Sequence, residues 1–259
     1  MLNIRPILAF DDNYIWLLQQ DGQRRVAVVD PGDETPVLEL LQSEGLELVA
    51  ILLTHKHGDH TGGVEDLLHA WPDAVVYGPA NEPIKTITNP AAGGDRVVLS
   101  DLDVEFVVMD VPGHTEGHLA YYGEGVLFCG DTMFAAGCGR VFSGTHEQLH
   151  ESLQNIAALP ADTKVYCAHE YTMANLGFAK WVEPDSRAVL ARIEKASEMR
   201  TRGEPTVPSL LQEELDTNPF LRVGEPNVIA AAENFAGRKL TPGAEVFTAI
   251  RNWKDQEYD

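Results

Sequence analysis

Short runs of apolar and strand-type residues predict a strand-rich first part of the chain. Three runs at 2–10, 14–18 and 25–29 predict strands, with Asp21-Gly22 as a hairpin turn between the second and third. Residues 78–94 are typical of a loop, and Gly123-Glu124-Gly125 predicts a second hairpin turn. The other predicted strands are 48–53, 74–77, 96–99, 102–109, 119–122, 126–129 and 164–167.

Helical spacing of apolar residues occurs at three places between these strands. Thr35 as a capping residue and Pro36 in the first turn predict a helix that runs to Gly45. Residues 64–68 predict a short helix, and Thr145 can cap a third helix whose apolar positions repeat at helical spacing. Helices thus alternate with strands, which is typical of a mixed α/β domain.

The pattern changes after residue 171, where no segment is convincing as a strand. Proline and glycine separate five helical segments there, which are 172–181, 185–202, 209–215, 227–235 and 243–254. The sequence therefore predicts an α/β domain over residues 1–170 and a smaller helical domain over residues 171–259.

Composition narrows the class of protein. The chain has 259 residues of which 44% are hydrophobic, enough for a globular core. Cys129, Cys138 and Cys167 have no CxxC spacing, so we expect small buried residues in a reducing compartment. Residues 1–16 contain two aspartates and no long apolar stretch, which argues against a signal peptide or a membrane span. We therefore expect a cytoplasmic protein.

Charge restricts the partners. The formal net charge of −21 repels nucleic acid and anionic membrane surfaces, so neither is an expected partner. A small polar substrate is favoured instead. If that substrate is anionic, a local cluster of basic residues must hold it against the field of the whole protein.

One stretch concentrates candidate chemistry. Residues 54–60, Thr-His-Lys-His-Gly-Asp-His, follow an apolar strand and contain His55, His57, Asp59 and His60. Neutral imidazole and carboxylate are ligands for zinc, iron and manganese. A solvated histidine-rich loop is the competing interpretation, and the density of ligands directly after a buried strand disfavours it.

The direction of these side chains favours two metals. If the chain leaves the strand extended, His55 and His57 point to the same side, whereas the adjacent Asp59 and His60 point apart. Such a spread suits two neighbouring metals better than one.

Further candidate ligands follow three other predicted strands, at His114, Asp131 and His169. The carboxyl ends of strands can converge on one edge of a sheet. Together with the first stretch, these residues supply five histidines and two aspartates, more than one tetrahedral zinc uses. The set fits two metals that share a bridging carboxylate.

Four motifs, THKHGDH, PGHTEGH, GDTMFAAGCGR and CAHEYT, carry a resemblance to a known family. In this order they resemble the metallo-β-lactamase superfamily, and specifically glyoxalase II, the hydroxyacylglutathione hydrolases. The C-terminal EVFTAIRNWKD is similar to that family as well. The resemblance implies an α/β fold, a metallo-β-lactamase-like αββα sandwich followed by a C-terminal helical domain that binds substrate.

The resemblance also implies two divalent metal ions per chain, zinc first, with iron and manganese as alternatives. The implied ligands are His55, His57 and His114 for one metal, Asp59, His60 and His169 for the other, and Asp131 as the bridge. His118 falls outside this set, and we expect it to form hydrogen bonds behind the ligands. We interpret His69, His146 and His150 as surface or packing histidines.

The implied reaction is hydrolysis of S-(2-hydroxyacyl)glutathione, such as S-D-lactoylglutathione, to glutathione and a 2-hydroxy acid in methylglyoxal detoxification. Two cations lower the pKa of a shared water from about 15.7 toward about 7. Asp59 and Asp131 are the expected catalytic residues, because Asp59 can orient the nucleophile while both bind metal. A thiol with a pKa of about 8.5 leaves without a dedicated general acid.

Contacts to the two carboxylates of a glutathione thioester are implied as well. The matching residues are Arg140, Tyr171, Arg251 and Lys254, which supply the basic cluster that the acidic surface makes necessary. Phe142 stands where animal members have tyrosine, so one hydroxyl contact to glutathione is missing. We expect a monomer whose partner is this small molecule.

Three alternatives compete with this prediction. A glutathione persulfide dioxygenase of the same superfamily uses similar motifs with a single iron, but the helical tail and its IRNWKD end argue against it. Another metallo-β-lactamase-fold hydrolase, acting on β-lactams or RNA, is disfavoured by the tail and the negative charge. A non-catalytic metal-binding scaffold is disfavoured because no ligand is missing.

The bridging assignment predicts that Asp131→Ala loses metal as well as rate, because each metal would lose one ligand. Elemental analysis of the purified variant beside the wild type measures this. Full occupancy of both metal sites in the variant would show that the assignment is wrong.

Overall fold

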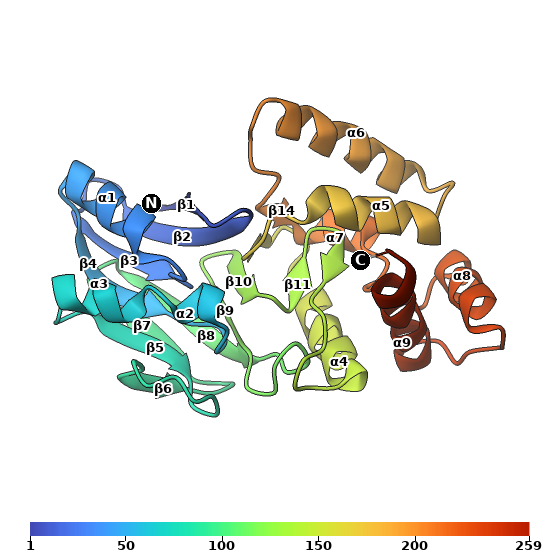
Figure 1. The fold of residues 1–259 in the computed structure, drawn as a ribbon, viewed down its shortest axis with the longest axis horizontal. Coiled ribbons are helices and arrows are strands. Elements are labelled where there is room, and N and C mark those ends of the chain that lie inside the picture. Colours follow the sequence, from blue (N-terminus) through green and yellow to red (C-terminus); the bar gives the residue numbers. More distant parts are fainter. Residues whose placement is uncertain (259) are drawn as a thin grey trace. The chain divides into compact units, whose positions relative to one another are not determined.

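The computed structural model describes residues 1–258, so only residue 259, the last of the predicted helical domain, lies outside it (Figure 1). Two compact units are formed, Met1–Val111 with Thr115–Gly130, and Pro112–His114 with the chain from Asp131 onward. We describe each unit by itself. This division by compactness does not test the predicted domains 1–170 and 171–259, which stay a prediction.

The first unit contains a six-stranded sheet in the order β1-β2-β3-β4-β5-β6. Its first three strands are antiparallel, and the pairs from β3 to β6 are parallel. The strands are β1 (Leu2–Ala9), β2 (Asn13–Gln20), β3 (Arg25–Val29), β4 (Glu47–Leu52), β5 (Val75–Pro79) and β6 (Asn89–Ala91).

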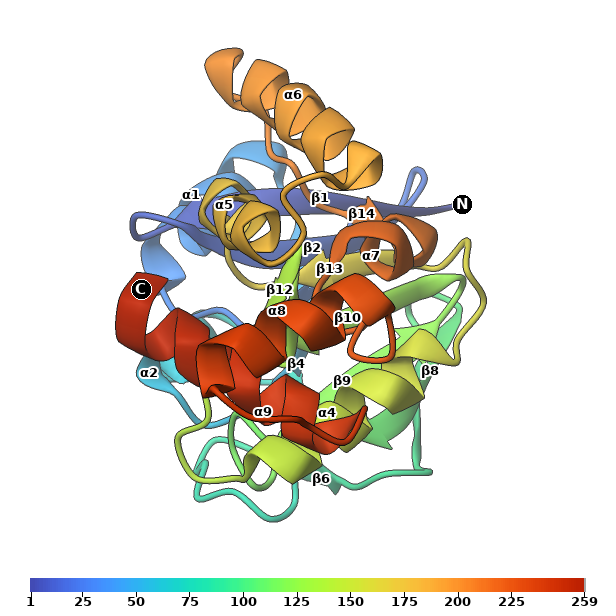
Figure 2. The ribbon, with the colours of Figure 1, turned by 90° about the vertical axis from the view of Figure 1, so that its right-hand side faces the viewer.

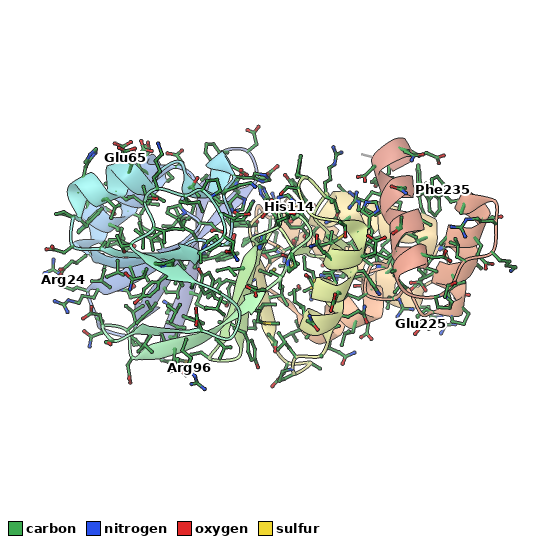
Figure 3. The ribbon with its side chains drawn as sticks, turned by 90° about the horizontal axis from the view of Figure 1, so that it is seen from below. Arg24, Glu65, Arg96, His114, Glu225 and Phe235 are labelled. Carbon is green, nitrogen blue, oxygen red and sulfur yellow. The ribbon has the colours of Figure 1, made fainter. Side chains whose placement is uncertain are left out.

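Both faces of this sheet are buried. On β2, Ile15 and Leu17 belong to a core shared with the helices, while Trp16 and Leu18 point to the opposite face and are also buried. The helices are α1 (Glu34–Glu44), α2 (Gly58–Thr61) and α3 (Val64–Ala70). Figure 3 shows the blue helices on one side of the first sheet and the green strands on the other.

Four antiparallel strands form the second layer of strands in this unit, in the order β10-β9-β8-β7. They are β7 (Arg96–Leu99), β8 (Val104–Asp110), β9 (Leu119–Gly123) and β10 (Val126–Gly130). The hydroxyl of the fully buried Tyr121 on β9 donates to the Leu53 carbonyl, 2.7 Å away, just after β4. This bond ties the two layers of strands together.

The second unit is mainly helical. Figure 2 shows α8 and α9 side by side, and α5 beside α6. Its strands are β11 (Met133–Phe134), β12 (Gly137–Cys138), β13 (Lys164–Cys167) and β14 (Ser209–Leu210). Its helices are α4 (His146–Ala157), α5 (Thr172–Val182), α6 (Arg187–Thr201), α7 (Leu211–Thr217), α8 (Pro226–Ala236), α9 (Ala244–Trp253) and a π-helix (Lys254–Tyr258).

The capping residue was predicted correctly for α4 and wrongly for α1. Thr145 caps α4 with a capping box, as predicted, because its side chain accepts from the Gln148 backbone N–H. The predicted cap Thr35 is wrong. Asp33 caps α1, because its carboxylate lies directly before the helix and accepts from the free Thr35 N–H at the second helical position.

Several short strands were missed by the sequence patterns. β6 lies within the predicted loop 78–94, and β11 and β12 were not predicted. The predicted helix 209–215 is wrong at its start, because Ser209 and Leu210 pair with β13 and only then does α7 begin. Strands of two or three residues are too short for an alternating pattern, so only their pairing partners define them.

Helix α2 and the π-helix were not predicted either. The other observed elements lie at predicted segments, with strands and interspersed helices followed by a helical C-terminal part. No helix among residues 1–258 combines the length and the apolar character needed to cross a membrane.

Tyr121→Phe should lower the free energy of unfolding by about 1–3 kcal/mol, because it leaves the buried Leu53 carbonyl without its donor. Burial raises the pKa of Tyr121 well above its usual value, so the hydroxyl stays protonated and the loss is the same across neutral pH. Urea denaturation measures it. Tyr122→Phe on the opposite face of β9 is the matched control, and equal losses in both variants would refute the role of this bond.

Candidate metal centre

The histidine-rich stretch begins extended and ends in a helix. After β4 the chain stays extended to His57, which precedes the short helix α2. His55 Nε2 lies 3.0 Å from His57 Nδ1, so the two imidazoles are on the same side, as an extended chain predicts. The predicted divergence of Asp59 and His60 is wrong. Both lie in α2, and Asp59 Oδ2 is 3.5 Å from His60 Nε2, because a helical turn replaces the assumed strand geometry.

His60 is oriented by a carboxylate that the sequence analysis missed. Asp30 follows β3, is buried, and approaches His60 Nδ1 with Oδ2 at 3.0 Å. The same carboxylate accepts from the Thr54 N–H at 2.8 Å and the Thr54 hydroxyl at 2.7 Å. A proton on Nδ1 donated to Asp30 leaves the Nε2 lone pair of His60 for a metal. The only signal in the sequence was an aspartate directly after a predicted strand.

Asp59 has a similar partner. The buried side chain of Asn13, the first residue of β2, lies with its Nδ2 atom 3.2 Å from Asp59 Oδ2 and 3.3 Å from the Asp59 carbonyl. The amide thereby fixes one carboxylate oxygen and directs the other. Nothing in the sequence pattern distinguishes Asn13 from an ordinary strand-edge residue.

Loop 30–32 packs closely against α2. A Cβ on Gly32 would lie 1.8 Å from the Asp59 carbonyl oxygen, so only glycine permits this approach. The Gly63 N–H donates to the Pro31 carbonyl at 3.0 Å. The ends of β3 and β4 thus hold each other, and the ligand candidates of the first unit are part of that contact.

In the second unit, two further predicted ligands, His114 and His169, lie beside Asp131. Its Oδ2 lies 3.5 Å from His114 Nε2, and its Oδ1 lies 3.4 Å from His169 Nε2. His114 Nδ1 is 2.7 Å from the Arg140 carbonyl, which fixes the proton on Nδ1 and leaves Nε2 for a metal. Figure 3 shows His114 among closely packed side chains.

These clusters of histidine and aspartate fit divalent metal binding. The donor atoms of His55 and His57 lie within 4.8 Å of each other, and so do those of His114 and Asp131. Imidazole and carboxylate donors are the set that zinc, iron and manganese accept. The types of donor present therefore fit a divalent metal. Which residue binds which metal remains a prediction from the sequence.

His118 is fully buried in the first unit and stacks on His55, with ring centroids 4.6 Å apart. Its Nδ1 lies 2.9 Å from the Leu119 carbonyl, a hydrogen-bonding position behind a ligand candidate. A Cβ on Gly130, which has a φ of 47°, would lie 2.8 Å from His118 Cε1, so glycine leaves room for the ring. This surrounding fits the expected role of His118.

The other histidines and the cysteines are packing or surface residues. His69 is exposed, and the rings of His146 and His150 pack on Phe247. The cysteines are buried, as predicted, and burial raises the pKa of Cys138 to about 11 and that of Cys167 to about 12. Both thiols are therefore protonated near neutral pH.

The predicted substrate residues have unequal surroundings. Arg140 is exposed, and its Nε lies 3.7 Å from Asp255 Oδ1. Tyr171 is 37% exposed and stacks on His169 at 4.8 Å, so one face remains accessible. Arg251 is fully buried, where it donates to the Cys138 carbonyl at 3.1 Å and to Asp255 at 2.8 Å.

Lys254 and Phe142 differ in exposure. Lys254 is buried at the start of the π-helix. Phe142 is 66% exposed, and its ring meets the His114 ring edge-on at 5.2 Å. Its backbone N–H donates to the His114 carbonyl at 3.0 Å. An exposed aromatic ring thus stands beside a ligand candidate.

Two family models match the chain. The model described as the metallo-beta-lactamase superfamily matches residues 9–169, and the one described as the hydroxyacylglutathione hydrolase C-terminus matches residues 170–257. Both parts of the chain are therefore accounted for. The chain belongs to the hydroxyacylglutathione hydrolase family.

Curated relatives of this family match over nearly the whole length. A hydroxyacylglutathione hydrolase of Methylobacillus flagellatus is 52% identical over 98% of this chain and 99% of its own. The protein of the same name from Aliivibrio fischeri is 51% identical over 99% of this chain and all of its own. That from Nitrosomonas europaea is 48% identical over 98% of this chain and 96% of its own.

Solved structures confirm the metallo-β-lactamase fold that the resemblance implied. ETHE1 from Myxococcus xanthus matches all of this chain and 93% of its own with a TM-score of 0.67 at 21% identity, which shows the fold alone. TTHA1623 in a di-iron-bound form matches 64% of this chain and 91% of its own, with a TM-score of 0.54 and 29% identity. The α/β fold class with a helical C-terminal part is therefore confirmed.

Asp30→Asn should weaken metal binding about 10–100-fold, because the carboxylate that orients His60 is lost while the shape of the side chain is kept. Competition with a chromophoric chelator measures the affinity. Asp21→Asn, at an exposed position in the same unit, is the control. A chelator profile equal to that of the wild type would remove Asp30 from this role.

Proposed function

We propose that this chain hydrolyses S-(2-hydroxyacyl)glutathione thioesters, such as S-D-lactoylglutathione, to glutathione and a 2-hydroxy acid in methylglyoxal detoxification. One observation carries the proposal, the match of about 48–52% identity over almost the full length to proteins named hydroxyacylglutathione hydrolase. The match includes the C-terminal part, which has its own family model.

The proposed metal centre uses the seven ligands that the family resemblance implies. One divalent metal would bind His55, His57 and His114, a second would bind Asp59, His60 and His169, and Asp131 would bridge them. The approach of His114 and His169 to different oxygens of Asp131 supports the bridging role. The di-iron form of TTHA1623 supports two metals, and zinc, iron and manganese all suit the donors.

When bound, the two cations would supply a water of lowered pKa and polarise the thioester carbonyl. The residues of the chain do the rest. Asn13 fixes the Asp59 carboxylate, and Asp30 fixes the His60 ring, so neither ligand reorients during the reaction. The leaving thiolate, with a pKa of about 8.5, needs no proton donor. Burial raises the pKa of Cys138 and of Cys167, which disfavours both thiols as nucleophiles.

Substrate binding is proposed for the second unit. Arg140 and Tyr171 are accessible and would contact the glutathione carboxylates, with Lys254 adding charge. Arg251, which is buried like Lys254, is proposed as a further contact, as the resemblance implies, and it also holds Asp255, which faces Arg140. Residues 171–259 would then be the substrate-binding domain and residues 1–170 the catalytic domain.

The remaining features of the proposal concern partners and location. With a net charge of −21, neither nucleic acid nor an anionic membrane is a favourable partner. We propose a cytoplasmic monomer that acts on a small molecule. A persulfide dioxygenase is not favoured, because the relatives that match over the full length carry the hydrolase name.

An assay of the purified protein with S-D-lactoylglutathione tests the function. We expect loss of the thioester absorbance with stoichiometric release of thiol, and loss of this activity on chelation with recovery on adding metal. Asp59→Asn should abolish most of the rate. Oxygen consumption with glutathione persulfide and no thioester cleavage would reject the proposal in favour of the dioxygenase.

A further inference from the structure

A short hairpin connects the metal-ligand candidate Asp131 to the substrate-binding candidate Arg140. Strands β11 and β12 pair with each other alone, and Ala135 and Ala136 form the turn. The hairpin is almost fully buried, although a two-stranded hairpin is marginally stable by itself. Its position must therefore be set by its surroundings.

Buried polar side chains of the helices bind the backbone of this hairpin. Asn218, just after α7, donates to the Gly137 carbonyl at 2.9 Å and to the Phe134 carbonyl at 3.4 Å. Glu214 on α7 accepts from the Ala136 N–H at 2.8 Å. Asn218 and Glu214 are fully buried, so these bonds do not compete with water.

Two more helices add contacts on either side of the turn. Asn175 on α5 donates to the Ala135 carbonyl at 3.1 Å, and Arg251 on α9 donates to the Cys138 carbonyl at 3.1 Å. A Cβ on Gly137 would lie 2.5 Å from the amide of Asn175, so β12 can approach α5 this closely only because residue 137 is glycine. The carbonyls of residues 134, 135, 137 and 138 and the N–H of residue 136 are thus each bound by a side chain on, or just after, a helix of the same unit.

The turn also inserts an apolar group. Ala136 has a φ of 56°, a conformation that favours glycine, yet its methyl is buried against Leu176 and Ala196. The strained backbone is retained because the methyl packs between α5 and α6 while its N–H reaches Glu214. The hairpin tip is thus held by both packing and hydrogen bonds.

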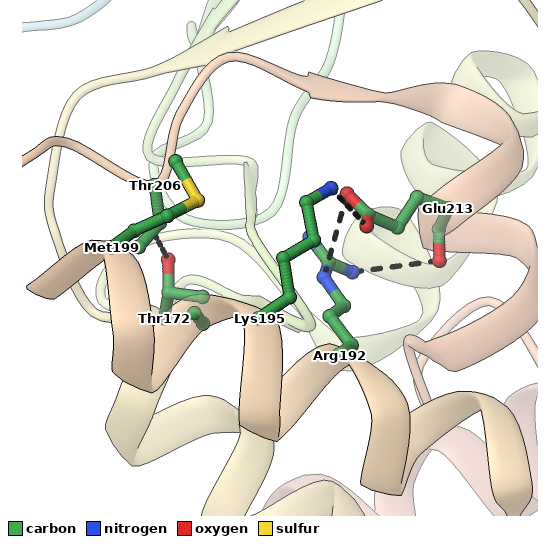
Figure 4. Close-up of a pocket in the computed structure, with 7 residues that line it drawn as sticks. Thr172, Arg192, Lys195, Met199, Thr206 and Glu213 are labelled. Carbon is green, nitrogen blue, oxygen red and sulfur yellow. Dashed lines mark hydrogen bonds and ion pairs between the residues drawn. The ribbon is translucent and has the colours of Figure 1, made fainter.

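The charge of Glu214 is neutralised from the adjacent helix. Arg192 on α6 donates to Glu214 Oε1 and, through Nη1, to the Thr217 hydroxyl at 2.6 Å. Figure 4 shows Arg192 and Lys195 facing Glu213 on the same side of α7. The three side chains line the pocket drawn in Figure 4. Their ion pairs join α6 to α7, the helix that carries Glu214.

The outgoing end of the hairpin contacts two of the three ligand candidates of this unit, His114 and Asp131. The Arg140 carbonyl binds His114 Nδ1 at 2.7 Å. A Cβ on Gly139 would lie 2.0 Å from the Asp131 carbonyl oxygen and 3.0 Å from His114 Nδ1. A displacement of the hairpin therefore shifts Asp131, the ring of His114 and Arg140 together.

We infer that Glu214 and Asn218 are positioning residues, which set the metal ligands Asp131 and His114 and the substrate contact Arg140 through the β11–β12 hairpin. The inference rests on the proposed function for the roles of these three residues. It assigns to the helical part of the chain a second task besides contact with substrate, control of ligand geometry in the metal centre.

Asn218→Ala tests this inference in the full-length protein. We expect the apparent affinity for zinc, measured by chelator competition, to fall about tenfold or more, as for other residues that support metal ligands. With metal in excess, kcat should stay reduced and KM for the thioester should rise, because Arg140 moves as well. Asn175→Ala should change zinc affinity in the same direction, and it serves if Asn218→Ala does not fold.

Glu183→Gln is the matched control. Glu183 is a buried carboxylate of the same unit that accepts from Arg222 at 2.8 Å and 3.1 Å, and it contacts no hairpin residue named above. It should lose thermal stability as the other variants do, with zinc affinity and KM unchanged.

Equal zinc affinity and equal kcat and KM in Asn218→Ala, Asn175→Ala and the control would overturn the inference and leave a purely structural network. A wild type that binds zinc but does not cleave the thioester would instead reject the proposed function. The zinc measurement would still test the hairpin in that case, because it requires no turnover.

Discussion

Fixing an imidazole ring in one tautomer is the constraint on which the chemistry of this chain depends. A histidine binds metal through a nitrogen that carries no proton, so the proton must be held at the other nitrogen. Asp30 does this for His60, and the Arg140 carbonyl does it for His114. One partner is a buried carboxylate and the other a backbone group, so the two rings depend on different parts of the fold.

Two left-handed residues mark where the backbone is bent to meet this constraint. Asp30 has a φ of 51° and Ala136 a φ of 56°, and each such position costs about 1–3 kcal/mol. Both stand at points where the chain is held by several hydrogen bonds. Asp30 binds Thr54 and His60, while the turn at Ala136 is bound by Glu214 and Asn175. The surrounding contacts offset the strain and fix the ligand candidates nearby.

The basic residues proposed to contact substrate all lie in one of the two units. A net charge of −21 spreads over the chain, yet Arg140, Arg251 and Lys254 are all in the second unit. Asp255 lies between two of them, 2.8 Å from Arg251 and 3.7 Å from Arg140. Arg140 is exposed at this carboxylate, whereas Arg251 is buried beside it.

The family, the fold class and the candidate ligands were determined by the sequence, because ligand types and motif order are properties of the chain itself. The strands before His55, His114, Asp131 and His169 were predictable from continuous apolar runs, and β3 was predicted at its observed bounds. Short strands such as β11, β12 and β14 were not, since two residues are too few to show an alternating pattern. Neither was the helical turn that brings Asp59 to His60.

Only the tertiary structure decided which polar residues support the ligands. Asp30, Asn13, Glu214 and Asn218 carry no motif, and their roles arise from burial beside a partner distant in sequence. Burial also distinguishes the buried Arg251 from the exposed Arg140, although both approach Asp255. The sequence motifs show which types of donor are present. The orientation of each donor is a property of what packs behind it, which no local pattern contains.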